Sequence, residues 1–152
     1  MKKQLLIALL AAAVAAPAAA GDTATLAVSA SVSGTCKFTT ATFNMNFGAL
    51  DPAAAANQTQ STALTYKCTK GQAATSFSFD ADAASPASVN ITNGTDNIPV
   101  SLSWTAPATV GTGFGAGSTA ISMTVQGDIL GTDYANVSAG AYTKNVAVVV
   151  AP

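Results

Sequence analysis

Hydrophobic and polar residues alternate strictly near the start of the chain, between residues 23 and 33. One set of alternate positions is entirely apolar, and the other consists of Ser and Thr apart from Ala27. A period of two is typical of a β-strand with one apolar and one polar face. The apolar face of this predicted strand is formed by Ala24, Leu26, Val28, Ala30 and Val32.

Shorter alternating stretches follow, separated by turn signals such as Asp51-Pro52, Lys70-Gly71 and Asn93-Gly94. No segment of useful length has the period of a helix, so the pattern predicts one all-β domain, a sandwich or a barrel. The predicted strands carry apolar residues at 43–47, 64–68, 77–79, 89–91, 98–104, 121–125 and 146–150.

Residues 1–20 have the features of a secretory signal peptide. Lys2 and Lys3 precede an apolar run, and Pro17 precedes a small-residue cleavage motif that ends at Ala20. The alternative is a membrane anchor, but the run is shorter than the roughly 20 apolar residues that a spanning helix needs. We therefore expect cleavage after Ala20 and export through the periplasm to the cell surface, and a mature chain long enough for one domain with a core.

The charge balance changes when the signal peptide is left out. Four Lys and seven Asp remain, which gives a net charge of 4 − 7 = −3, and the chain has no Arg, Glu or His. Four scattered lysines form no basic stripe, so we expect no nucleic acid among the partners. Such low charge favours an extracellular structural protein over a catalyst.

Cys36 and Cys68 are the two cysteines of the chain. In an oxidising compartment they are expected to form a disulfide, and the alternative is a pair of free buried thiols. Without His, two cysteines cannot complete a zinc site.

Candidate chemistry is sparse, and we expect neither an enzyme nor a cofactor. Asp80 and Asp82 could lie on one face, but they are better explained as turn residues than as a calcium site. The glycine-rich stretch 111–117 lacks the helix that a dinucleotide-binding loop requires, so a flexible loop is expected there. Trp104 alternates with apolar residues, which favours the core over a sugar-stacking surface.

The order of several short motifs resembles the spore coat protein U domain family, which includes the Csu-type subunits of archaic chaperone–usher pili. An alternating strand leads to SGTCKF at residues 33–38, then FNMNFGALDP at 43–52 and LTYKCTKG at 64–71. PVSLSW at 99–104, ISMTVQGDI at 121–129 and AGAYTKNVAVVV at 139–150 complete the series. Lys144 departs from the acidic residue usual in the last motif.

The resemblance implies an immunoglobulin-like β-sandwich that lacks its last strand and is completed by a donated one. Residues 1–20 would be the signal peptide, 21–34 the donor-strand segment and 35–152 the sandwich domain. Such subunits polymerise by β-strand addition with identical or related subunits. A periplasmic chaperone and an outer-membrane usher are the further partners implied. The open edge would follow the terminal strand with Tyr142, Val146, Val148 and Val150.

Two functions remain open at this point. In the first, the chain is an exported structural subunit of a pilus or surface coat, for adhesion and biofilm, and residues 23–33 belong to a neighbour's sheet. In the second, those residues are the first strand of the chain's own sheet, as sequential strands usually pair. The protein would then be a stand-alone secreted, lectin-like binding module with ligand-binding loops around residues 111–117.

Overall fold

The computed structural model describes residues 21–152. The predicted signal peptide, residues 1–20, lies outside the described residues and stays a prediction. The chain divides into two units between Ser31 and Val32.

The N-terminal arm, residues 21–33, forms neither helix nor strand. Every residue of the arm is exposed, including Leu26 at 85% and Val28 at 83%. The strand predicted for residues 23–33 is therefore not formed in this structure. An extended segment becomes a β-strand only when a neighbouring strand takes its backbone hydrogen bonds, and the sheets of this chain do not include the arm.

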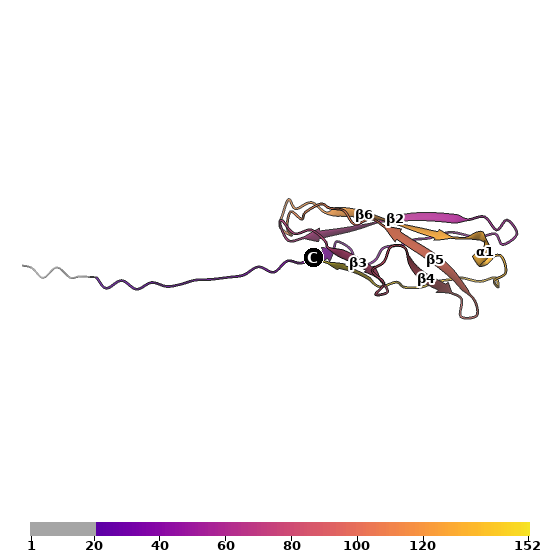
Figure 1. Cartoon of the computed structure of the whole chain (residues 1–152), viewed down its shortest axis with the longest axis horizontal. Coiled ribbons are helices and arrows are strands. Elements are labelled where there is room, and N and C mark those ends of the chain that lie inside the picture. Colours follow the sequence, from indigo (N-terminus) through magenta and orange to yellow (C-terminus); the bar gives the residue numbers. More distant parts are fainter. Residues whose placement is uncertain (1–20) are drawn as a thin grey trace, which may run out of the picture. The chain divides into compact units, whose positions relative to one another are not determined.

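Residues 36–129 supply the larger sheet of the sandwich, which has five strands (Figure 1). All the pairs are antiparallel, and the order across the sheet is β1-β2-β6-β5-β4. The strands are β1 (Cys36–Phe38), β2 (Gln58–Cys68), β4 (Ala87–Thr92), β5 (Asn97–Trp104) and β6 (Ile121–Ile129).

A second sheet consists of β3 (Ser76–Phe79) and β7 (Val148–Ala151), which are antiparallel. The one helix among residues 21–152 is the short α1 (Gly131–Tyr134), which follows β6. The all-β fold class predicted from the sequence is confirmed, and the arrangement is that of an incomplete β-sandwich.

The core lies between the two sheets and is built from the alternate apolar residues that the sequence pattern identifies. In β6, Ile121, Met123 and Val125 are buried while the residues between them are exposed. Tyr66 of β2 meets Phe77 of β3 edge to face, with ring centroids 5.3 Å apart. Trp104 is partly buried against this core, with its ring 4.4 Å from that of Phe79, as expected from the alternation.

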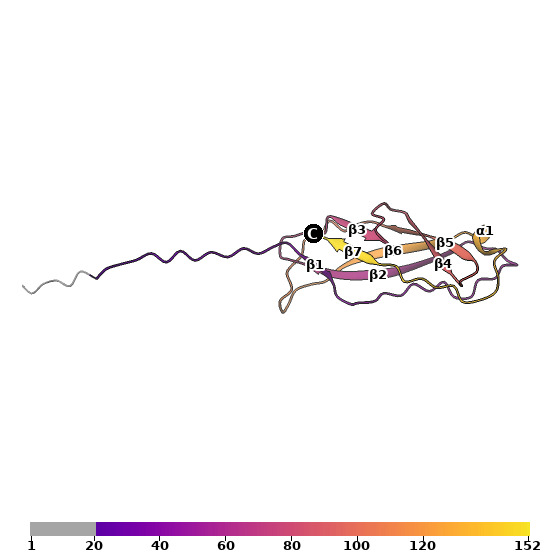
Figure 2. The same cartoon turned by 90° about the horizontal axis from the view of Figure 1, so that it is seen from below.

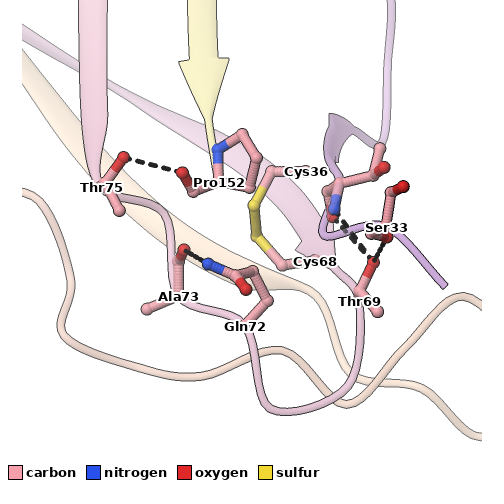
Figure 3. Close-up of a disulfide and its surroundings, with 9 residues drawn as sticks. Ser33, Cys36, Cys68, Thr69, Gln72, Ala73, Thr75 and Pro152 are labelled. Atoms are coloured by element: carbon pink, nitrogen blue, oxygen red, sulfur yellow. Dashed lines mark hydrogen bonds between the residues drawn. A yellow bond between two sulfur atoms is a disulfide. The ribbon is translucent and has the colours of Figure 1, made fainter. Parts of the chain in front are cut away.

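Cys36 and Cys68 form the predicted disulfide, and they are directly paired residues of β1 and β2. Beside it, the Thr35 N–H donates to Thr69 Oγ1 at 3.1 Å and the Thr69 N–H donates to the Thr35 carbonyl at 2.9 Å. Figure 3 shows Pro152 close to this disulfide, where its carbonyl accepts a hydrogen bond from Thr75. Residues 33–35 and the end of β7 therefore lie at the same end of the sandwich.

Candidate functional site: an open apolar groove

A groove of about 510 Å³ opens into the core of the sandwich. Its floor is apolar and comes from both sheets, with Leu64 of β2, Leu102 of β5 and Val125 of β6 among the floor residues. Residues 41–47 form one wall, and residues 144–148 form the other. Figure 2 shows these two segments as coil leading away from β1 and into β7.

The first wall has the pattern of a strand without being one. Phe43, Met45 and Phe47 are half-buried, and Asn44 and Asn46 between them are exposed. No backbone group of residues 43–47 hydrogen-bonds another backbone group. The strand predicted at 43–47 is thus absent from this structure, although its side chains already point as those of a strand do. A backbone neighbour is what this segment lacks.

Gly127 of β6 lets the first wall lie close to the floor. A Cβ at position 127 would stand 2.4 Å from Met45 Sδ and 2.9 Å from the Phe47 ring, distances that real side chains do not reach. A glycine inside a strand often marks such a close approach. The glycine in ISMTVQGDI was therefore a usable signal that the sequence reasoning missed.

The second wall contains the predicted terminal edge residues. Tyr142, Val146, Val148 and Val150 are all half-buried, although only the last two lie within β7. The sequence placed the four residues on one strand, and the structure brings them into one inward-facing series against the core.

The backbone of the second wall is bonded on one side only. The Asp80 N–H donates to the Ala147 carbonyl at 2.8 Å, and the Thr75 N–H donates to the Ala151 carbonyl at 2.9 Å, both toward β3. Backbone groups of successive strand residues point to opposite sides. Those of Val146, Val148 and Val150 therefore point away from β3, to an edge beside which residues 21–152 place no strand.

A second hollow, of about 820 Å³, continues from the first. The two share Met45, Phe47, Ile91, Lys144 and Asn145 in their linings. The second extends between residues 45–50 and residues 137–145, so each wall of the combined groove is about ten residues long. At the rise of a β-strand, this corresponds to about 33 Å.

A polar network fixes the far end of the second wall. The Tyr142 hydroxyl donates to the Ser138 carbonyl at 2.7 Å, and Asn93 Nδ2 donates to the Tyr142 hydroxyl at 3.0 Å. Asp96 accepts from both the hydroxyl and the N–H of Ser138, and these hydrogen bonds hold its pKa below the usual value. A tyrosine that binds the backbone a few residues upstream is a feature of immunoglobulin-like sandwiches near the start of the sixth strand.

Lys144 and Asp80 form an ion pair on the second wall, with Nζ 2.8 Å from Oδ2. The hydrogen bond from Lys144 and a second from the Ala147 N–H hold the pKa of Asp80 below its usual value. Because the folded pKa lies below the unfolded one, this contact stabilises the fold at neutral pH. That contribution is lost as the pH falls through the lowered pKa.

The remaining candidate residues have structural roles. Asp82 Oδ1 accepts from the Ala84 N–H at 2.9 Å, which makes it a turn residue as expected. Within residues 21–152, no cluster of three His, Cys, Asp or Glu could hold a metal ion. Gly111, in the glycine-rich loop, packs so tightly on Cys68 that a Cβ would lie 2.3 Å from the Cys68 carbonyl oxygen.

The protein defined by these features is an incomplete β-sandwich with an open groove between two walls, neither of which has a partner strand on the side that faces the groove. The chain belongs to the Spore Coat Protein U domain family, whose model matches residues 22–149. This membership supports, in general terms, a structural surface subunit of the fimbrial or pilus type. No curated protein and no solved structure matches the chain. In the part of the chain that the structure describes, no helix is both long and apolar enough to cross a membrane.

Proposed function

We propose that the protein is an exported structural subunit that polymerises by inserting the N-terminal arm of one copy into the groove of the next. The polymer is a pilus or surface coat that serves adhesion and biofilm formation. A periplasmic chaperone first protects the open groove, and an outer-membrane usher carries the growing fibre to the surface.

One observation carries this proposal. The same chain contains a segment with a strand pattern but no partner, the arm, and a sandwich that lacks a strand, at the groove. The arm presents exposed apolar side chains on alternate residues, and the groove offers an apolar floor between two walls whose facing backbone edges have no partner strand. By area bookkeeping, each full burial of Leu26, Val28 or Val32 contributes about 1.5–3 kcal/mol. New backbone hydrogen bonds along both walls add to this gain.

The lengths of the arm and of the groove also support the arm as the strand that fills the groove. The alternating part of the arm covers residues 23–33, and each wall of the combined groove is about ten residues long. A strand from a second copy therefore has the length to fill the whole groove, as expected for β-strand addition.

The direction of the strands favours a neighbour's arm over the chain's own. Residues 33–35 lie at the end of the sandwich where β7 finishes, so a chain that folded its own arm back would place it parallel to β7. An arm from another copy can run antiparallel, which is the more stable pairing per residue. Such head-to-tail contacts are heterologous and produce open filaments.

A substitution pair on the two faces of the arm tests this proposal. Val28→Asp places a carboxylate on the apolar face, and we expect it to remove the heat-sensitive multimers of the exported protein in detergent gels, because a buried unpaired charge is costly. Ser29→Asp, one residue along on the polar face, is the matched control and should leave the multimers unchanged. Equal effects of the two substitutions, or no effect of either, would contradict the proposal.

A further inference from the structure

We propose that the arm seats in one fixed register, in which Ala30 of the incoming copy lies opposite Lys144 of the receiving copy. This inference rests on the proposed strand exchange and adds to it the alignment of the two strands. Its structural basis is the Lys144–Asp80 ion pair, which fixes the one charged side chain among the even-numbered residues 142–150 of the second wall. Lys144 itself is exposed, whereas the other four are half-buried.

The backbone decides whether even-numbered or odd-numbered residues of the second wall lie opposite the apolar residues of the arm, which is the parity of the register. Thr143 is bonded to Thr92 and Ala147 to Asp80, both on the side away from the open edge. The four-residue spacing between them keeps the alternation intact, so the even-numbered residues from 142 to 150 direct their backbone groups to the open edge. Directly opposed residues of antiparallel strands share a face, and a slip of one residue would turn the Ser and Thr face of the arm into the core.

Among the remaining alignments, one matches five positions to five. It pairs the five apolar residues of the arm with the five even-numbered residues from 142 to 150. Every other alignment of the same parity that overlaps these positions places an apolar residue of the arm opposite Gly140 or Pro152, and this alignment avoids both. The pairs are Ala24 with Val150, Leu26 with Val148, Val28 with Val146, Ala30 with Lys144, and Val32 with Tyr142.

Side-chain size selects the same alignment. Lys144 is held by its ion pair with Asp80 and lines both hollows, so a large side chain opposite it would compete with the lysine for the same space. The proposed register puts Ala30, the one small residue between larger ones, at this place. A slip of two residues in either direction would press Val28 or Val32 against Lys144 and leave an alanine opposite Tyr142 or Val146. Lys144 is therefore a residue that sets the register.

Paired cysteines can report the register in assembled fibres of the full chain. Val28→Cys with Val146→Cys marks the proposed alignment, and Leu26→Cys or Ala30→Cys with Val146→Cys marks the two slipped ones. Directly opposed strand residues lie within disulfide reach, as the native pair Cys36 and Cys68 already shows, whereas diagonal ones are about 7–8 Å apart. After mild oxidation, we expect the first pair to give at least about tenfold more covalent multimers in boiled, non-reducing gels.

A size exchange tests the role of Lys144. Ala30→Leu should lower the temperature at which multimers dissociate, and adding Lys144→Ala should restore most of that loss. Thr143→Ala is the matched control on the outward side of the wall and should not rescue Ala30→Leu. If Thr143→Ala rescued Ala30→Leu as well as Lys144→Ala does, the role given to Lys144 would be overturned.

The outcomes separate the register from the strand exchange. A dominant cross-link in a slipped pair, or no cross-link while unboiled multimers persist, would overturn the register and leave strand exchange standing. If the unsubstituted chain formed no multimers, this would contradict strand exchange itself, and the register with it.

Discussion

A chain that lacks residues 21–33 is expected to be exported yet to form no multimers of its own. The arm supplies the inserted strand, and its removal leaves the groove walls, at residues 41–50 and 137–148, unchanged. The readout is an unboiled detergent gel of surface-exposed protein, in which the intact chain gives multimer bands and the shortened chain gives monomer. Retention of the multimers by the shortened chain would contradict the assignment of the arm as donor.

The same shortened chain has a second expected behaviour that separates donation from mere misfolding. It keeps the groove, so it can receive an arm but cannot offer one. Produced together with the intact chain, it should enter multimers once and shift the distribution toward short species. A misfolded chain would be absent from the multimers and leave their length unchanged. Internal substitution of the arm by an equal length of Gly and Ser is the control for the loss of chain length.

Moving the arm to the other terminus is expected to produce a stable monomer. In this variant residues 21–33 are removed, and a copy of residues 22–33 follows Pro152 through a short Gly-Ser turn. Because β7 ends at Ala151, one residue before Pro152, the copied strand would begin at that end of the groove and run antiparallel to β7. Burial of Leu26, Val28 and Val32 then occurs within one chain.

The expected gain in stability is large. Three buried aliphatic side chains contribute about 5 kcal/mol or more, which corresponds to a rise of about 15 °C in the thermal midpoint relative to the chain without any arm. The measurement is thermal unfolding followed by circular dichroism, with light scattering to confirm the monomer. A graft carrying Val28→Asp is the matched control and should lose most of the gain. An unmodified graft with no gain at all would mean that the groove does not accept this strand.

Much of the sandwich follows from alternation along the sequence. The strands around Leu64, Ile98 and Ile121 lie where the period of two places them, because each buries one face against the core. The disulfide also follows from the sequence, since the export expected from residues 1–20 leaves the two cysteines with only each other as partners. Within the paired strands, sequence alternation thus predicts which side chains are buried.

The same pattern predicted strands wrongly where no second segment pairs with the backbone. Residues 23–33 and 43–47 alternate as strands do, yet neither forms a strand in this structure, because neither has a bonded neighbour. Alternation reports the preference of side chains for one face, whereas strand formation depends on a second segment that can lie elsewhere in the chain or in another copy. Both failures occur in the segments that the proposed assembly would join.

Other features of the site depend on contacts that no local pattern contains. The approach of Met45 to Gly127 joins residues 82 positions apart, since 127 − 45 = 82. The bonds from Tyr142 to Ser138 and from Asn93 to Tyr142 tie the β4–β5 turn to the second wall. The sequence marked Tyr142 as an edge residue, but only the three-dimensional arrangement shows that it anchors one end of the groove.

The central claim is that the arm of one copy completes the sandwich of another. Electrophoresis of the exported, unsubstituted protein in detergent, with and without boiling, tests it most directly. We expect a ladder of multimers without boiling that collapses to monomer after boiling, because strands shared between chains are released only when the sandwich unfolds. A single monomer band under both conditions, with cooperative unfolding of the purified chain, would contradict the claim.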